Sequence, residues 1–149
     1  MNKKAEDFKA YLDEKDIKVF EIEEVNDEQE TAVFRSHIMV SGQQLPTVVI
    51  FDKSIFTVIR VQVSPQALVE DNQVELLNLI NEENFKYKPF KLYFNPSGNL
   101  FLDLCLTAEN NEISGDTVYL MFNIIINYLN ENYRDMMKAI WGANSEQEK

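Results

Sequence analysis

The sequence predicts an α+β domain of two layers, an antiparallel sheet with helices packed on it, in the order α-β-β-β-β-α-β-β-α. Apolar residues recur with helical spacing near both ends of the chain, in residues 3–15 and after residue 114. Between these regions, short runs alternate apolar and polar residues, as half-buried strands do. Short turns join most neighbouring runs, and such connections favour antiparallel hairpins.

The first half of the chain is predicted to contain one helix and four strands. The helix over residues 3–15 carries its apolar residues on one face: Ala5, Phe8, Tyr11 and Leu12. Alternation then predicts strands at residues 19–25, 31–41, 46–51 and 55–63. The polar connections between them predict turns, including one over residues 42–44.

The second half is predicted to add a helix and a hairpin. Ser64-Pro65 breaks the strand pattern, and a leucine-rich helix over residues 66–84 follows. Strands at residues 88–95 and 100–106 then flank a tight turn, in which Gly98 can take a positive φ angle.

The last helix carries more apolar surface than one sheet face can cover. It is predicted to begin at a cap from Ser114 or Asp116 and to end near Trp141, before Gly142. One apolar stripe of this helix is predicted to face the core. Other apolar residues lie beside that stripe or on the polar face of the helix. Surplus apolar surface marks interfaces, so we expect a homodimer through this helix; the alternative is cover by another element of the chain. The candidate interface residues are Leu120, Ile124, Tyr119 and Ile126.

Length and composition indicate one acidic domain. The chain has 149 residues, of which 45% are hydrophobic, enough for a single core. We expect the domain to span residues 1–143 and the polar residues 144–149 to form a flexible tail. The formal net charge of −11 disfavours nucleic acid and anionic membranes as partners. It favours basic partners, or serves solubility alone.

The chain is expected to be cytoplasmic. Cys105 is the one cysteine, so no intrachain disulfide forms, which fits a reducing compartment. Met1–Asp16 is charged throughout and does not resemble a signal peptide. The longest apolar stretch, Val118–Leu129, is interrupted by asparagines and is shorter than the roughly 20 residues of a membrane span.

No catalytic, metal or cofactor site is predicted, so we expect no enzymatic activity. The sequence has no phosphate-binding glycine loop and no nucleophile motif. Cys105 and His37 have the residue types of a nucleophile–base pair. We favour a structural role for Cys105 and a surface position for His37. The acidic clusters at residues 70–75 and 82–83 do not match a calcium loop and indicate a solvated helix face.

Four segments resemble one bacterial family. They are Leu76–Asn81, Phe85–Tyr87, the hairpin Phe90–Leu106, and a long last helix that ends in Ala139–Trp141. Together they are similar to the YbjN-like family, which has the type III secretion chaperone-like fold, and the layout agrees over roughly residues 3–141. The resemblance implies no enzymatic site. It implies a protein-binding domain that is often dimeric.

These observations favour a non-enzymatic protein-interaction, chaperone-like or regulatory module. We expect it to act as a homodimer that binds an unidentified protein. The alternative is a small-molecule- or metal-binding domain with a pocket between sheet and helices, and a third possibility is an enzyme that uses carboxylates alone. A well-formed pocket with convergent polar groups would favour the last two, and a flat apolar surface would favour the first.

Overall fold

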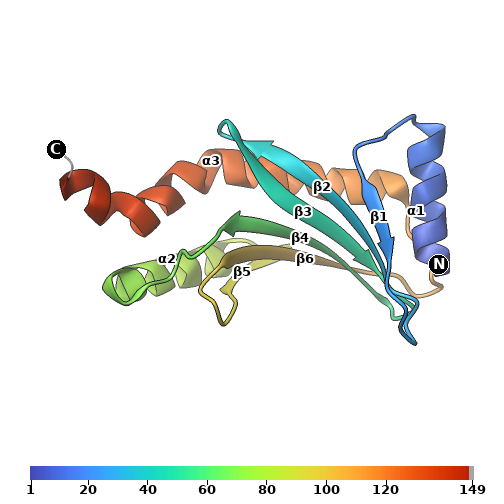
Figure 1. The fold of residues 1–149 in the computed structure, drawn as a ribbon, viewed down its shortest axis with the longest axis horizontal. Coiled ribbons are helices and arrows are strands. Elements are labelled where there is room, and N and C mark those ends of the chain that lie inside the picture. The colour runs from blue at the N-terminus through green and yellow to red at the C-terminus, as the bar shows by residue number, and fades with distance from the viewer. Residues whose placement is uncertain (148–149) are drawn as a thin grey trace.

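A computed structural model describes the backbone of residues 1–147 and the side chains of residues 1–142 (Figure 1). It contains a six-stranded antiparallel sheet with three helices packed on it, which confirms the predicted fold class. The helices are α1 (Lys3–Glu14), α2 (Gln73–Lys86) and α3 (Gly115–Gln147), and a 3-10 turn, η1 (Glu70–Asn72), precedes α2. The strands are β1 (Glu21–Glu24), β2 (Ala32–Val40), β3 (Gln43–Phe51), β4 (Phe56–Ser64), β5 (Phe90–Phe94) and β6 (Leu100–Thr107).

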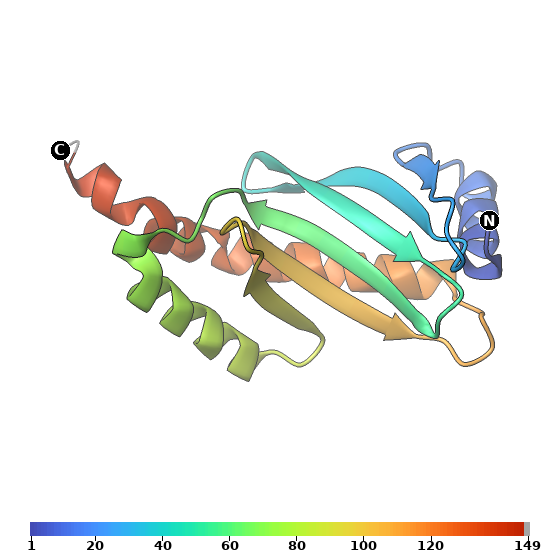
Figure 2. The same ribbon diagram turned by 60° about the horizontal axis from the view of Figure 1, so that its bottom comes forward.

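The strands follow the order β1-β2-β3-β4-β6-β5 across the sheet. The first four strands form consecutive hairpins, and then the chain passes through α2 to the far edge and returns as β6. The long helix α3 runs along one face of the sheet, with α1 at one end and α2 beside β5 at the other (Figures 1 and 2). The two edges of the sheet therefore lie in very different surroundings.

The core lies between the sheet and α1 and α3. Alternate residues of β2 are buried, as the alternation predicted, and Phe8 of α1 is fully buried against them. Five aromatic rings lie with their centroids 5.3 to 6.3 Å from the ring of Phe8: Tyr11, Phe20, Phe34, Phe51 and Tyr119. The predicted core stripe of α3 is largely buried, including Val118, Phe122, Ile125, Leu129, Met136 and Ile140.

Two turns use left-handed backbone conformations. Ser41 and Gly42 have φ angles of 49° and 80° and join β2 to β3 in two residues, a tighter turn than residues 42–44 predicted. Gly98 has a φ angle of 79°, which confirms the predicted positive φ, and a Cβ there would lie 2.8 Å from the carbonyl oxygen of Leu68. That backbone contact keeps the 95–99 turn against the segment before α2.

The predicted start of the second helix, at residue 66, is wrong. Residues 66–69 are not helical, because the side chain of Asn72 forms hydrogen bonds with the backbone of this segment. Its amide nitrogen donates to the carbonyl oxygens of Ala67 (2.7 Å) and Ile140 (3.3 Å), and its oxygen accepts from the backbone N–H of Val69 (2.9 Å). These bonds hold the backbone in a non-helical path, and α2 begins only at Gln73.

The ends of two other elements also differ from expectation. The first strand covers Glu21–Glu24 and not residues 19–25, because the ring of Phe20 packs in the core among Phe8, Phe34 and Phe122. The last helix does not end near Trp141 but continues to Gln147. Of the predicted tail 144–149, the first four residues continue α3, and residues 148–149 lie outside the described residues.

Candidate functional site

Half of β2 forms an open edge of the sheet. β1 pairs with β2 only as far as Glu21, which lies opposite Arg35, whereas β2 continues to Val40. The segment Ser36–Val40 therefore pairs with β3 on one side, and within residues 1–147 no strand pairs with it on the other. At about 3.3 Å per residue it offers about 16 Å of edge. We call this segment the β2 edge.

The free peptide groups of the β2 edge can be assigned from the strand alternation. The backbone N–H of Val25 donates to the carbonyl oxygen of Thr31 at 2.8 Å, so the carbonyl of Thr31 faces the side of β1. In an antiparallel ladder, every second residue directs its peptide groups to the same side. The peptide groups of His37 and Met39 consequently face outward, beyond Glu21, the first residue of β1.

The opposite edge of the sheet is closed by a side chain. Asn84, near the end of α2, donates from its amide nitrogen to the carbonyl oxygen of Leu92 (3.0 Å) and accepts from its N–H (2.8 Å). This pair of bonds occupies the outward peptide groups in the middle of β5. Proteins commonly cover or block exposed strand edges, because an open edge pairs with other chains. The molecule blocks its β5 edge and leaves the β2 edge open.

Two hollows flank the β2 edge, one on each face of the sheet. Both include Val19, Ser36 and His37. The hollow on the helix side measures about 250 Å³ and is mostly apolar; Phe20, Ile38, Met39, Tyr119, Phe122, Asn123 and Ile126 complete its lining. The hollow on the bare side measures about 340 Å³, and its remaining lining residues are Glu21, Arg35, Pro46, Thr47 and Val48. We call them the helix-side hollow and the bare-side hollow.

The arrangement matches what an added strand requires. Successive side chains of an extended segment point to opposite faces of a sheet, so a strand along Ser36–Val40 would direct them alternately into the two hollows. The rim is apolar, since Met39 is 54% exposed and Val19 is 63% exposed. The helix-side hollow is smaller than the about 300–1,000 Å³ of sites that enclose drug-sized ligands. Its size suits single side chains better than a whole small molecule.

The four predicted interface residues are divided between two surfaces. Tyr119 and Ile126 line the helix-side hollow. The ring of Tyr119 lies 5.9 Å from that of Tyr11, and burial raises the pKa of its hydroxyl. Leu120 is 56% exposed and Ile124 is half-buried, and neither lines this hollow.

Sequence reasoning missed the contribution of the sheet to this site. The four candidate interface residues that it named all lie on the last helix, although β2 supplies the open peptide groups. One signal was present, because Met39 is a large apolar residue on the same pleat as Arg35 and His37. The absence of strand pairing before Glu21 gave no comparable signal, since residues 19 and 20 continue the alternating pattern.

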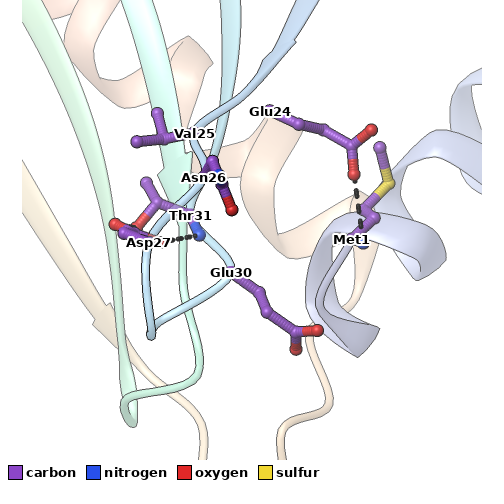
Figure 3. Close-up of a pocket in the computed structure, with 7 residues that line it drawn as sticks. All are labelled: Met1, Glu24, Val25, Asn26, Asp27, Glu30 and Thr31. Atoms are coloured by element: carbon purple, nitrogen blue, oxygen red, sulfur yellow. Dashed lines mark hydrogen bonds and ion pairs between the residues drawn. The ribbon is translucent and has the colours of Figure 1, made fainter.

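A third hollow, near the N-terminus, is polar, and its terminal amino group, Glu24 and Asp27 have bonding partners within it (Figure 3). The terminal amino group lies 3.0 Å from Oε1 of Glu24, and the hydrogen bond and charge of this carboxylate raise the pKa of the amino group. Asp27 accepts bonds from the N–H and hydroxyl of Thr31 at 2.9 and 2.7 Å, which lower the pKa of its carboxyl group. These groups fix the loop between β1 and β2, and we assign no ligand to this hollow of about 270 Å³.

The candidate catalytic and metal-binding residues do not converge. Cys105 on β6 and His37 on β2 are both exposed, and β3 and β4 lie between their strands. Three strand spacings amount to about 14 Å across the sheet, and the register adds to this distance, because Cys105 is level with Val33, four residues from His37. Within residues 1–147, no three His, Cys, Asp or Glu side chains gather closely enough to hold a metal ion. Over the same residues, no helix has the length and apolarity to cross a bilayer.

Glu83 is buried, although the sequence indicated that the acidic clusters at residues 70–75 and 82–83 lie on a solvated helix face. Glu83 is only 5% exposed, because the α2 face that carries it packs towards α3. Its Oε1 accepts a hydrogen bond from the hydroxyl of Tyr128 at 2.8 Å, and its Oε2 lies 3.4 Å from Nζ of Lys86. Glu83 therefore links α2 to α3, while Glu70, Asp71, Glu75 and Glu82 are exposed.

Comparison with known proteins identifies the fold and leaves the family open. No protein-family model and no curated protein matches the chain. Among solved structures, the chain is similar to one in the crystal structure of the ExsC–ExsE complex, with a TM-score of 0.57 and 10% sequence identity. The alignment covers 90% of this chain and 96% of that chain. The chain thus has the type III secretion chaperone-like fold, whereas the narrower YbjN-like assignment has no support from a family model.

Proposed function

We propose that this chain is a non-enzymatic, chaperone-like protein-binding module that binds an extended segment of another protein along the β2 edge. The observation that carries the proposal is the open edge at Ser36–Val40 with a hollow on each face. In this mode of recognition, main-chain hydrogen bonds supply affinity and side-chain pockets supply specificity. The fold supports it further, because the similar chain belongs to a complex of two proteins, ExsC and ExsE.

The predicted partner is an extended segment of about five residues whose alternate side chains are apolar. The apolar positions would enter the helix-side hollow between Phe20, Tyr119 and Ile126. The net charge of −11 favours segments whose flanking residues are basic. The protein would keep such a segment in an extended form and protect its apolar side chains from water.

Replacing His37 with proline should abolish binding of such segments while leaving the fold intact. The N–H of His37 faces the open side, so proline removes no bond to β3, and proline is tolerated on edge strands. One carbonyl oxygen of an added strand would lose the N–H that donates to it, and the strand would meet the proline ring. The measurement is binding of the labelled protein to an array of synthetic peptides of about ten residues, with and without alternating valines and lysine flanks.

The matched control is His37→Ala, which removes the imidazole but keeps the N–H. We expect this variant to bind the alternating peptides about as well as the wild type. Amide hydrogen exchange gives a second measurement, because a bound strand should slow exchange at His37 and Met39. The proposal is wrong if alternating peptides bind no better than shuffled ones, or if His37→Pro binds them like the wild type.

We also propose that the protein forms a homodimer through α3. The support is the surface formed by Leu120, which is 56% exposed, and Ile124, which lies one turn further and is half-buried. Both lie outside the set of side chains packed on the core. A second copy that placed the same residues against them would bury apolar surface in both chains at once.

The double substitution Leu120→Glu with Ile124→Glu should give a folded monomer, because four carboxylates would meet across the two-fold contact. Light scattering over a concentration series measures this as a halving of the molar mass relative to wild type. The control is Ser97→Glu with Asn110→Glu, which adds the same charge at exposed loop positions and should leave the mass unchanged. A wild type that is monomeric at every concentration contradicts the dimer.

A further inference from the structure

The outer face of α2 carries apolar side chains that the described part of the chain leaves exposed. The opposite face of the helix holds its buried residues, Leu76, Ile80 and Glu83. At 100° per residue, the stripe consists of Val74, Leu77, Asn78, Asn81 and Phe85. Both views place α2 at the margin of the molecule, beside β5 and the end of α3 (Figures 1 and 2). We call this set of five residues the α2 stripe.

The apolar side chains of the α2 stripe are unusually exposed. Phe85 is 91% exposed, Val74 is 78% exposed and Leu77 is 42% exposed. Among the residues whose side chains are described, no other large apolar side chain is as exposed as that of Phe85. Asn78 and Asn81 lie between these side chains, and several large apolar side chains exposed on one helix face favour a site of interaction with another molecule.

The position of Phe85 is fixed by its neighbours in the chain. Glu83 is bonded to Tyr128, and Asn84 makes two hydrogen bonds to the backbone of Leu92. The helix ends directly afterwards, where the N–H of Tyr87 donates to the carbonyl oxygen of Glu83 at 3.2 Å. Phe85 therefore points outward from an anchored turn, so a partner would meet a preorganised contact.

The surroundings of the α2 stripe are acidic. Residues 66–85 include five acidic residues and no lysine or arginine: Glu70, Asp71, Glu75, Glu82 and Glu83. Glu75 and Glu82 are exposed, and their spacing of seven residues places them on the same flank of the stripe. The next base along the chain, Lys86, is paired with Glu83 at 3.4 Å.

This charge pattern favours a positively charged partner over a second copy of the chain. In an antiparallel two-fold contact between two copies of α2, Glu75 and Glu82 would lie against Glu82 and Glu75 of the second copy, and such like-charge contacts disfavour that arrangement. A parallel two-fold contact would separate these acids but would offer them no positive charge. An anionic membrane is disfavoured for the same reason. A partner with positive charge beside its apolar residues would instead be complementary to the stripe in both respects.

We propose that the α2 stripe binds a cationic amphipathic helix of another protein. The partner would carry apolar residues with helical spacing along one face, packed on Val74, Leu77 and Phe85, and lysines or arginines beside them, near Glu75 and Glu82. In helix-on-helix packing of this kind, a groove contacts apolar side chains that lie about one turn apart on the bound helix. The site lies beyond β5, at the opposite side of the sheet from the β2 edge, so it is a second binding surface.

The test uses a fluorescent synthetic peptide of about 14 residues, as long as α2, with leucines on one helical face and lysines elsewhere. A shuffled peptide of the same composition serves as the probe control. Fluorescence anisotropy should show that Phe85→Ser weakens binding of the amphipathic peptide about tenfold or more, as expected for an anchor residue. The matched protein control is Ile55→Ser, which removes an apolar side chain of 50% exposure elsewhere and should leave the affinity unchanged.

Two further variants separate the possible results. Glu75→Gln with Glu82→Gln should weaken binding and reduce its dependence on salt. His37→Pro should leave binding of this peptide unchanged, so failure at one surface does not imply failure at the other. The proposal is overturned if the shuffled peptide binds equally well, or if Phe85→Ser has no effect. It is also overturned if light scattering shows a dimer that Phe85→Ser dissociates, since the occupant would then be a second copy.

Discussion

Replacing Phe8 with alanine should lower the free energy of unfolding by about 3–5 kcal/mol, the largest effect we expect from one substitution. The side chain is fully buried at the place where α1, β2, β3 and α3 meet. Its ring packs against five others, so truncation leaves a cavity between elements that are far apart in sequence. Whole domains have stabilities of about 5–15 kcal/mol, so this loss is a large fraction of the total.

Urea denaturation followed by circular dichroism measures this change. Phe85→Ala is the matched control, because the same ring is 91% exposed there, and it should change the free energy of unfolding by no more than about 0.5 kcal/mol. Equal effects at the two positions would mean that Phe8 does not lie in the core described above.

Replacing Tyr128 with phenylalanine should lower the free energy of unfolding by about 1.5–3 kcal/mol, because a buried charged group loses its hydrogen bond. The hydroxyl of Tyr128 donates to Glu83 at 2.8 Å, and both side chains are nearly buried. Without the hydroxyl, the carboxylate of Glu83 keeps only the contact with Lys86 at 3.4 Å. Adding Glu83→Gln removes the unpaired charge, so the double variant should recover part of the loss.

The same pair predicts a dependence of stability on alkaline pH. Burial, followed by the hydrogen bond and the negative charge of Glu83, raises the pKa of Tyr128 well above its ordinary value in the folded state. A raised pKa means that the stabilisation is complete below pH 10 and is lost as the pH rises above the unfolded-state value. The free energy of unfolding of the wild type should therefore fall more steeply above pH 10 than that of Tyr128→Phe, by up to about 1.4 kcal/mol per pH unit. Parallel slopes for the two proteins would contradict this assignment.

The strand pattern was predictable because alternation depends on local sequence. The residues that alternate in β2, β4 and β6 are those whose pleats face the helices, and a period of two reports this directly. Gly98 was predictable for a similar reason, since the turn needs a positive φ angle that glycine takes without strain.

The errors at element boundaries come from contacts with distant residues. The second helix starts late because Asn72 bonds to Ile140, 68 positions further along the chain. The first strand is short because Phe20 packs against Phe122 of α3. Neither contact leaves a mark in the local sequence pattern.

The candidate site was only half predictable. The excess apolar surface of the last helix was visible as a pattern, and two of its residues, Tyr119 and Ile126, line the helix-side hollow. The β2 edge was not visible, because pairing depends on which strands become neighbours. The function of Asn84 was hidden too, since only the packing of α2 beside β5 brings its side chain to Leu92.

The fold class, the acidic charge and the surplus apolar surface follow from the amino-acid sequence, because periodicity depends on neighbouring residues and charge depends on composition alone. The location of that surface and the strand edge that stays open depend on how distant segments pack. An edge is open or closed according to contacts between distant segments, as Asn84 closes β5 and Phe20 leaves β2 uncovered beyond Arg35. These contacts join segments that are far apart in the chain, and they place the β2 edge and the α2 stripe towards opposite edges of one sheet.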